Sequence, residues 1–307
     1  MKILIIGASG LIGSALSAEA KKQGHTVLGT YLNYPQENLE RLDYGDSYQL
    51  NDILDKFSPE VILCPAAKTN VDWIEQNPQE AWEINVVKLN TLLNACTKRN
   101  ITVAYFSSDY IFDGKSGPYS EDDIPNPLNF YGKHKLASEI MIKSFSPEKH
   151  FIFRTTWVFG YEKQEKNFLY SVIKTLNAGK ELKVPDDMYA TASYTPDIAK
   201  CALNLIEKKL YGTYNLCGNE YTSRYDYSKV IAKVFGLNPS LLIPAKYSSV
   251  QYIAARPLKA GLKNEKATKA SMIKWISTEE ALKEIKIQIE TAYGKSIRTL
   301  SSSKQPG

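Results

Sequence analysis

A phenol and an ammonium group lie four residues apart in the stretch YGKHK, residues 131–135. Residues at this spacing share one face of a helix, so Tyr131 and Lys135 are predicted to be neighbours. The positive charge of Lys135 would favour the phenolate and so lower the pKa of Tyr131. A tyrosine of lowered pKa can exchange a proton with a carbonyl or an alcohol at neutral pH.

A hydroxyl group, that of Ser108, ends the β-rich stretch TVAYFSS at residues 102–108. Open α/β sheets bind ligands at the carboxyl ends of their strands, so Ser108 could bond the same substrate oxygen as Tyr131. An exposed amphipathic pair is the alternative for Tyr131 and Lys135, because the chain has 20 tyrosines. Their position after a strand that ends in two serines favours chemistry. With a nicotinamide nearby, the set predicts a carbonyl reductase.

A glycine-rich turn, GASGLIG at residues 7–13, follows a predicted strand at 2–6 and precedes a predicted helix. Gly7 permits the tight turn, Gly10 lets a phosphate approach the backbone, and Gly13 lets the helix pack against the strand. The helix N-terminus would offer N–H groups and the positive end of its dipole to a pyrophosphate. The spacing differs from the common G-x-G-x-x-G. The strand–turn–helix context nonetheless predicts dinucleotide binding.

The second predicted strand ends in GTYLN, residues 29–33, without the acid that binds the ribose 2′-hydroxyl in many NAD-dependent proteins. A 2′-phosphate would therefore fit beside Thr30, which favours NADP(H). No arginine lies at this position, so NAD(H) stays open. The next acid, Asp43, follows a third short strand and could bond the adenine. A turn aspartate is an equally good interpretation of Asp43.

Strands alternate with helices over the first half of the chain, which predicts βαβ units and a doubly wound parallel sheet. The predicted strands are 2–6, 25–31, 60–67, 102–108 and 150–160. The predicted helices are 11–23, 49–57, 78–99 and 129–144. Later helices are predicted at 165–178, 195–208, 224–235 and 277–290, with a short strand at 213–217. We therefore expect an α/β fold with a Rossmann-type NAD(P)-binding domain over 1–160. A smaller α/β substrate-binding domain should lie mostly in 161–300, interleaved with the first, before a disordered polar tail at 301–307.

Composition excludes several classes of protein. Hydrophobic residues make up 43% and charged residues 23% of the chain, which is ordinary for a globular protein. No segment approaches the roughly 18 consecutive apolar residues of a membrane span. Four cysteines without a C-x-x-C pair and three scattered histidines predict no metal site, and buried thiols in the cytoplasm. The net charge of +5 does not favour nucleic acid.

Together these residues resemble the extended short-chain dehydrogenase/reductase superfamily, and within it the dTDP-4-dehydrorhamnose reductase family. The resembling segments are AAKTNVDWIEQNP (66–78), FSSDYIFDG (106–114), YSEDDIPNPLNFYGKHKLASE (119–139), RTTWVFG (154–160) and ARPLKAGL (255–262). The resemblance implies NADPH-dependent reduction of the C4 ketone of a dTDP-6-deoxy-4-ketosugar, with a hydride from the nicotinamide and a proton from Tyr131.

The resemblance also implies site residues. Ser108, Tyr131 and Lys135 match the catalytic set, with Lys135 also holding the cofactor ribose. The cofactor-binding residues implied or expected are Gly7, Ser9, Gly10, Leu11, Ile12, Gly13, Thr30, Asp43, Tyr44, Ala66, Ala67, Lys68, Tyr131 and Lys135. The substrate-binding residues implied are Ser108, Asp109, Trp157, Asn167 and Arg256, the last at the diphosphate of a nucleoside-diphosphate sugar.

Two departures from the family pattern affect specificity. Lys68 stands where the family usually has an aromatic residue after paired alanines. The segment DDMYATASYTPDIAK, residues 186–200, keeps Asp186, Thr195 and Asp197 but lacks the family's usual Gln, Gly and Pro-Thr pattern between them. The sugar and the nucleotide base are therefore left open.

A second resemblance is to the regulatory β subunit of methionine adenosyltransferase, which binds NADP and acts as the partner of another enzyme. It rests on SSDYIFDG, EDDIPNPLNFYGKHKL, CGNEYTSRYDYSKVIAKVFGLNPS (217–240) and the Ala-Arg-Pro motif. An epimerase that keeps NAD bound is a third alternative. A homodimer is compatible with each of these readings. Seven basic residues between Lys246 and Lys274 could attract an anionic substrate, although a solvated surface explains most of them.

Overall fold

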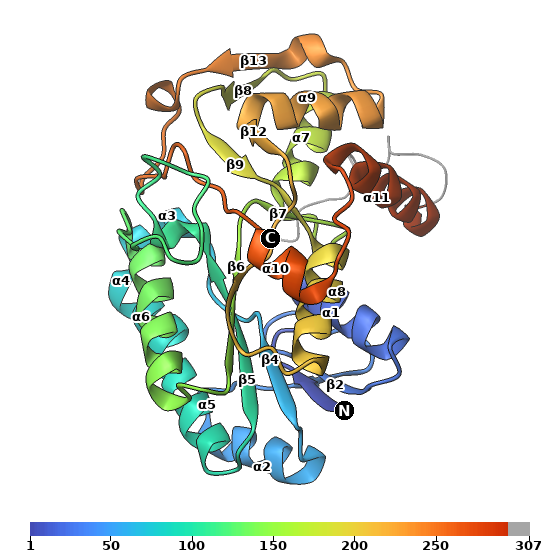
Figure 1. Ribbon diagram of the computed structural model, residues 1–307. Coiled ribbons are helices and arrows are strands. Elements are labelled where there is room, and N and C mark those ends of the chain that lie inside the picture. Colours follow the sequence, from blue (N-terminus) through green and yellow to red (C-terminus); the bar gives the residue numbers. More distant parts are fainter. Residues whose placement is uncertain (294–307) are drawn as a thin grey trace.

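The largest element of the protein is a parallel β-sheet, seen in the computed structural model, which describes residues 1–293 (Figure 1). Within this part of the chain, seven strands pair in the order β11-β6-β5-β4-β1-β2-β3. The strands are β1 Lys2–Ile5, β2 Thr26–Tyr31, β3 Leu39–Arg41, β4 Val61–Cys64, β5 Thr102–Ser108, β6 His150–Thr155 and β11 Gly212–Asn215. All neighbouring pairs are parallel, so every strand has its carboxyl end at the same edge. This arrangement confirms the predicted Rossmann-type α/β fold.

Helices cover both faces of the sheet, because its strands are apolar on both sides. Ile3 and Ile5 of β1 join the core formed with α1 (Leu11–Lys22), α8 (Thr195–Glu207) and α10 (Glu265–Ser271). Leu4 joins the opposite core, formed with α2 (Ser47–Phe57), α5 (Lys88–Thr97) and α6 (Phe130–Phe145). Figure 1 shows α5 and α6 to the left of the strands and α1 and α8 to the right. The alternation of side chains along each strand therefore builds two separate cores.

The helix predicted over 78–99 contains a π-helical turn. The structure has α4 at Pro78–Trp82, the π-helical turn at Glu83–Val87, and then α5. Asn85, within this turn, accepts a hydrogen bond from the N–H of Lys68 at 2.8 Å and donates to its carbonyl at 3.1 Å. A π-helical turn of this kind is frequent at functional sites. Here it places an amide side chain against the loop that follows β4.

The single strand predicted over 150–160 is wrong. Strand β6 ends at Thr155, and β7 (Val158–Phe159) pairs instead with β10 (Ser193–Tyr194) outside the main sheet. Trp157 lies between them with φ of 36°, in a region that bulky residues rarely adopt. The chain therefore leaves the sheet at this residue. Two further helices, α3 (Val71–Gln76) and α10, were not predicted from the sequence.

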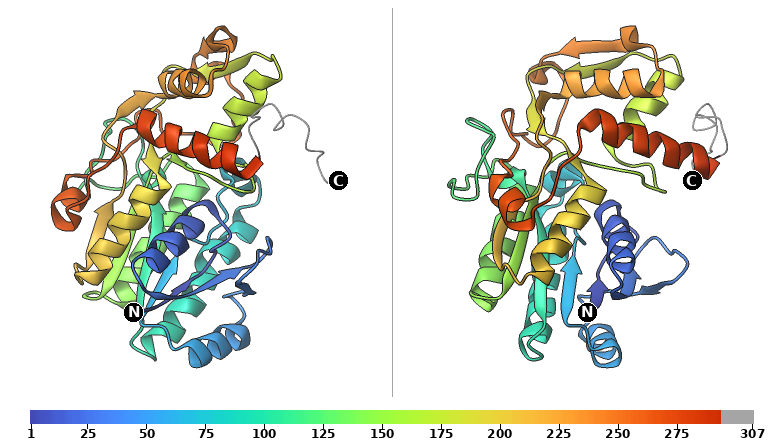
Figure 2. Two further views of the ribbon diagram at one scale, coloured as in Figure 1. Left: turned by 90° about the vertical axis from the view of Figure 1, so that its right-hand side faces the viewer. Right: turned by 45° about the vertical axis from the view of Figure 1, so that its right-hand side comes forward.

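A smaller lobe lies beside the carboxyl edge of the sheet, in the upper part of both views of Figure 2. Its core packs α7 (Phe168–Asn177), α9 (Arg224–Phe235) and α11 (Thr278–Tyr293) together with the paired strands β8 (Leu182–Pro185) and β13 (Leu242–Ala245). Strands β9 (Tyr189–Thr191) and β12 (Tyr221–Ser223) form an antiparallel pair. The stretch after residue 160 also supplies β11 to the central sheet and α8 to the helices that cover one face of it. The tail at 301–307 lies outside the described residues.

Within residues 1–293, no helix is both long and apolar enough to cross a membrane.

Candidate active site

The first turn of α6 lies against the segment that follows β5, and Asn129 and Gly132 shape this contact. Asn129 caps the helix, since its Oδ1 accepts a hydrogen bond from the N–H of Gly132 at 2.9 Å. Any side chain at Gly132 would collide with the backbone of Tyr110, because a Cβ there would lie 2.1 Å from the Tyr110 carbonyl oxygen. This close approach brings Tyr131 beside Ser108, as the sequence predicts.

Tyr131 keeps its proton at neutral pH. Burial raises the pKa of Tyr131 well above its usual value of 10, and a hydrogen bond with Ser108 only partly opposes this effect. The ring of Tyr110 packs edge-on against that of Tyr131, with ring centroids 5.7 Å apart. The expectation that Lys135 lowers the pKa of Tyr131 is therefore wrong, because burial dominates. A neutral phenol is the form that can donate a proton.

Lys135 shares the helix face with Tyr131, but its ammonium group is bonded elsewhere. Its Nζ donates to the carbonyl oxygen of Phe106 at 2.7 Å and lies 5.8 Å from the centre of the Tyr131 ring. Its Nζ also lies 4.6 Å from the centre of the Tyr105 ring. Only 3% of the residue is exposed, and burial lowers the pKa of Lys135 to about 8. The site therefore holds a buried ammonium group that titrates close to physiological pH.

Asp109 fixes the orientation of Ser108. The hydroxyl of Ser108 donates to Oδ1 of Asp109 at 3.2 Å. The other carboxylate oxygen accepts from Oγ1 of Thr156 at 2.5 Å and from the N–H of Gly261 at 3.3 Å. Burial raises the pKa of Asp109 to about 6. This carboxylate joins the ends of β5 and β6 to a segment far along the chain.

The glycine-rich loop between β1 and α1 has the shape of a phosphate cradle. Gly7 adopts a φ of +87°, and a Cβ added to Gly13 would lie 2.2 Å from the Gly7 carbonyl oxygen. Among the described residues, no side chain caps the N-terminus of α1, which begins at Leu11 after Gly10. The N–H groups of its first turn are thus left for a ligand such as a pyrophosphate. The loop fits the dinucleotide that the sequence predicts.

Two glutamines from distant segments hold the phosphate loop. The carbonyl oxygen of Ser9 accepts from Nε2 of Gln36 at 3.2 Å and from Nε2 of Gln164 at 3.1 Å. Gln164 lies just before α7, so the start of the small lobe contacts the proposed cofactor site directly. Sequence reasoning missed both glutamines, because nothing local to either residue indicates this contact.

Four other cofactor candidates make contacts within the protein. Thr30 is buried and donates from its Oγ1 to the carbonyl oxygen of Ile5 at 3.3 Å. Asp43 forms an ion pair with Lys88, with 2.6 Å between Oδ2 and Nζ. Tyr44 is buried, and its pKa is raised by that burial. Lys68 places its Nζ 4.2 Å from the centre of the Trp73 ring.

The alanine pair that precedes Lys68 lies beside the phosphate loop. A Cβ added to Gly7 would be 3.1 Å from the Cβ of Ala66. Ala67 follows Ala66 in the loop after β4. The loop after β4 and the glycine turn therefore border the same part of the carboxyl edge.

The remaining substrate candidates lie on the lobe side of the site. Asn167 caps α7, since its Oδ1 accepts from the N–H of Leu169 at 3.2 Å. Arg256 forms an ion pair with Asp72, with Nη2 and Oδ1 2.8 Å apart, and 10% of the arginine side chain is exposed. Trp157 holds the strained backbone position between β6 and β7.

Arg224, at the start of α9, is a candidate that sequence reasoning missed. Its guanidinium carbon lies 4.3 Å from the centre of the Trp157 ring and 3.7 Å from that of Phe168. The preceding Ser223 caps α9 by accepting from the N–H of Asp226 at 2.9 Å. The S-x-x-D spacing indicates a helix start. It does not indicate that the arginine faces Trp157.

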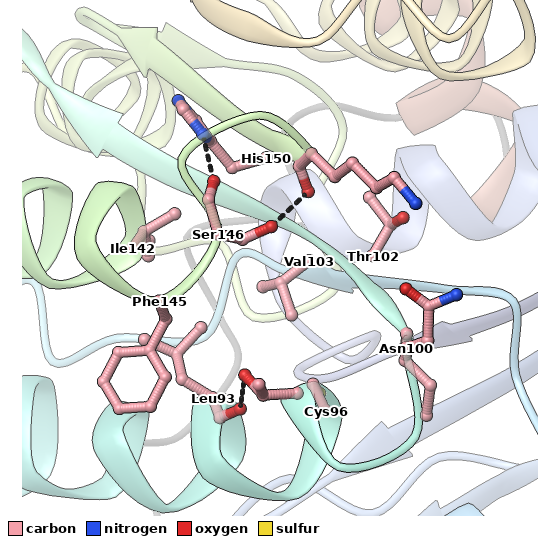
Figure 3. Close-up of a pocket in the computed structure, with 12 residues that line it drawn as sticks. Leu93, Cys96, Asn100, Thr102, Val103, Ile142, Phe145, Ser146 and His150 are labelled. Atoms are coloured by element: carbon pink, nitrogen blue, oxygen red, sulfur yellow. Dashed lines mark hydrogen bonds between the residues drawn. The ribbon is translucent and has the colours of Figure 1, made fainter.

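A hollow of about 150 Å³ lies at the opposite edge of the sheet (Figure 3). It is bordered by Thr102 and His150, which begin β5 and β6, and by Cys96 and Ile142 from the adjoining helices. Nδ1 of His150 is within 2.7 Å of the Ser146 carbonyl oxygen, as the dashed line in Figure 3 shows. Ligands of open α/β sheets bind at carboxyl ends, so this hollow is not the candidate active site.

The chain matches known proteins along nearly its whole length. The model of the RmlD substrate binding domain family matches residues 1–290. A dTDP-4-dehydrorhamnose reductase from Aggregatibacter actinomycetemcomitans is 30% identical over 302 residues, covering 94% of this chain and 99% of the relative. The methionine adenosyltransferase 2 subunit beta of Xenopus tropicalis is 32% identical over 252 residues, covering 79% and 75%.

A solved structure agrees with this relationship. The dTDP-4-dehydrorhamnose reductase of Bacillus anthracis, in complex with NADP, superimposes with a TM-score of 0.84 at 26% identity. The match covers 94% of this chain and 99% of that one. The family model, the curated relatives and the fold agree, and the chain belongs to the RmlD substrate binding domain family.

Proposed function

We propose that the protein reduces the C4 ketone of a dTDP-4-keto-6-deoxysugar to the alcohol, using NADPH. The observation that carries this proposal is the placement of Ser108, Tyr131 and Lys135 together at the carboxyl edge of the sheet. The glycine cradle borders the same edge, because β5 and β1 are both neighbours of β4. Relatives named dTDP-4-dehydrorhamnose reductase support the choice of substrate.

Each polar group of the catalytic set has a definite task in this reaction. Bound NADPH would supply the hydride, with the loop at 7–13 and Lys135 holding the cofactor. Tyr131, neutral because burial raises its pKa, donates its phenolic proton to the carbonyl oxygen as that oxygen becomes an alcohol. The hydroxyl of Ser108 polarises the same oxygen by hydrogen bonding. Ser108 would turn its proton from Asp109 towards the substrate.

The substrate would lie between the sheet and the small lobe. Asp109, Trp157 and Asn167 are the side chains proposed near the sugar and its phosphates, and Arg256 is proposed at the diphosphate. The contact between Gln164 and the phosphate loop supports a site in which cofactor and substrate are adjacent. Location in the cytoplasm and assembly as a homodimer stay predictions from the sequence.

The end of β2 bears on the choice between NADPH and NADH. Thr30 and its neighbours at the end of β2 provide no acid for a ribose 2′-hydroxyl, which favours NADP(H) over NAD(H). The related Bacillus anthracis structure contains NADP. We therefore propose NADPH as the preferred reductant, with NADH as a weaker one.

A second candidate function is regulation of another enzyme. The observation in its favour is the 32% identity to the methionine adenosyltransferase 2 subunit beta of Xenopus tropicalis. A regulatory subunit would bind the dinucleotide and a partner protein without turnover. The reductase relative matches 94% of this chain and 99% of its own length, against 79% and 75% for the regulatory subunit, so the reductase is the better-supported function.

The test is loss of NADPH absorbance on mixing the protein with enzymatically generated dTDP-4-keto-6-deoxyglucose or its 3,5-epimer. Loss that depends on both sugar nucleotide and protein, and is slower with NADH, is expected. Tight NADPH binding without any loss, together with a stable complex with methionine adenosyltransferase, would reject the reductase in favour of the regulatory role.

A further inference from the structure

Arg224 is a partly exposed arginine whose guanidinium group lies beside two aromatic rings. Trp157 and Phe168 lie within 4.3 Å and 3.7 Å of its central carbon, measured to the ring centres. Among residues 1–293, no side-chain or backbone oxygen accepts a hydrogen bond from this guanidinium, and no carboxylate forms an ion pair with it. Burial lowers the pKa of Arg224, which shows the cost of keeping a cation there.

Aromatic rings compensate only part of that cost. A cation–π contact stabilises the charge of the group, but an arginine also carries five N–H donors in the plane of its fork. The two rings lie within cation–π distance of the guanidinium but do not accept these in-plane hydrogen bonds. The contacts of Trp157 and Phe168 therefore fix the position of Arg224 and leave its donors for a ligand.

A second arginine, Arg256, lies near Arg224 and also has a hydrogen-bond donor without a partner in the described structure. Nη2 of Arg256 is paired with Asp72, but its Nη1 is buried without a hydrogen-bond partner in the described structure. Burial raises the pKa of Tyr110 and of Tyr252, and the charges of both guanidinium groups partly oppose this rise, so both cations lie near the same two phenols. The central carbon of Arg256 is 5.3 Å from the centre of the Tyr252 ring. Tyr110 is two residues from Ser108, which places this pair of cations beside the candidate active site.

The acids of this region are already engaged. Asp72 accepts from Arg256 and, at 3.0 Å, from the N–H of Ala254. Asp109 is bonded by Thr156 and Gly261 and acts on Arg224 only through space. No acid of this region is left to pair with Arg224, so its guanidinium group is open to water or to an external anion. Because the two forks come from different elements, an anion with two separate groups of oxygens fits better than a single carboxylate.

We propose that Arg224 and Arg256 together bind the diphosphate of the substrate, and that Arg224 makes the site select a diphosphate over a monophosphate. This inference rests on the proposed function, from which the nucleoside-diphosphate sugar is taken. It adds Arg224, a residue on α9, to the Arg256 expected from the sequence. The arginine also joins the small lobe to the substrate, since α9 belongs to the lobe core.

Calorimetric titration of the whole protein with dTDP and dTMP tests the proposal without any need for turnover. Arg224→Gln removes the charge, and Arg224→Lys keeps the charge but loses the fork. A charge-assisted hydrogen bond contributes about 1.5–3 kcal/mol, so Arg224→Gln should weaken dTDP binding about 10- to 100-fold. Binding of dTMP should change by less than about threefold, and Arg224→Lys should fall between the wild type and Arg224→Gln.

The matched control is Lys229→Gln, which removes an exposed cation from the same helix. It should leave dTDP binding unchanged, and the dissociation constant of NADPH should be the same in all variants. Equal affinity of wild type and Arg224→Gln for dTDP would overturn the proposal. So would equal weakening by Lys229→Gln, or a wild type that binds no nucleoside diphosphate.

A carboxylate on the sugar is the other anionic group of a sugar nucleotide that could pair with Arg224. Arg224→Gln could leave the binding of dTDP intact but weaken the binding of UDP-glucuronic acid. The arginine would then contact the carboxylate of the sugar, and the diphosphate assignment would be wrong. Failure of the reductase is a separate result. A protein that binds dTDP through Arg224 but oxidises no NADPH keeps this inference and rejects the proposed reaction.

Discussion

The buried ammonium group of Lys135 should make the protein less stable than it would be without it. Burial lowers the pKa of Lys135 from its ordinary 10.5 to about 8. At 1.36 kcal/mol per pKa unit, this shift corresponds to about 3 kcal/mol against folding when the lysine is charged. A substitution at Lys135 also removes its hydrogen bond to the Phe106 carbonyl oxygen, which lowers the free energy of unfolding by about 1 kcal/mol. We therefore expect Lys135→Met to raise the free energy of unfolding by about 2 kcal/mol at pH 7.

The pH dependence of this gain has a definite sign. Below pH 8 the lysine is protonated in both the folded and the unfolded chain, so its full destabilising effect is present. Between pH 8 and 10.5 the unfolded chain binds more protons, so the stability of the wild type rises with pH relative to the variant. The advantage of Lys135→Met should therefore shrink across this window and vanish near its upper end.

Urea unfolding followed by far-ultraviolet circular dichroism at pH 7 and pH 9.5 measures this difference. Lys133→Met is the matched control, because Lys133 is exposed on the same helix and its substitution should change stability by less than about 0.5 kcal/mol. A less stable Lys135→Met at pH 7, or a gain that does not depend on pH, would refute the reasoning. Lys135→Met should also lack reductase activity, so stability and function oppose each other here.

Three further predictions concern the elements around the site. Glu139→Gln should lower the free energy of unfolding by about 3 kcal/mol in urea titrations, because it leaves Arg154 charged in a bidentate pair whose side chains are 3% and 1% exposed. In thermal unfolding, Gly13→Ala should be clearly destabilised and Gly10→Ala much less so, because the added Cβ atoms lie 2.2 Å and 3.4 Å from the nearest backbone oxygen. A pH profile of kcat/KM should fall as pH rises through about 8, when Lys135 loses its charge.

Local sequence patterns predicted the parts of the fold that depend on local physics. The alternation of apolar strands and helices indicated the parallel sheet, and the four-residue spacing placed Tyr131 and Lys135 on one face of α6. The order of the glycines in 7–13 indicated the turn between β1 and α1. These features need only neighbouring residues, so they can be predicted from a single sequence.

Contacts between distant segments could not be predicted in the same way. The effect of Lys135 on Tyr131 was misjudged because burial, which raises the pKa of the phenol, depends on the packing of the whole site. The pairing of Asp43 with Lys88 and the position of Arg224 against Trp157 each join residues far apart in the chain. The bend at Trp157 likewise depends on its tertiary surroundings, since the sequence from 150 to 160 is uniformly typical of a strand.

The central claim is that Tyr131 donates the proton in reduction of a sugar-nucleotide ketone. The most direct test compares NADPH oxidation by the wild type and Tyr131→Phe with dTDP-4-keto-6-deoxysugar, and measures NADPH binding by both proteins. We predict that turnover falls by at least about 100-fold in the variant while its NADPH dissociation constant changes by less than about threefold. Full turnover by Tyr131→Phe would contradict the proposed role of Tyr131 and, with it, the mechanism.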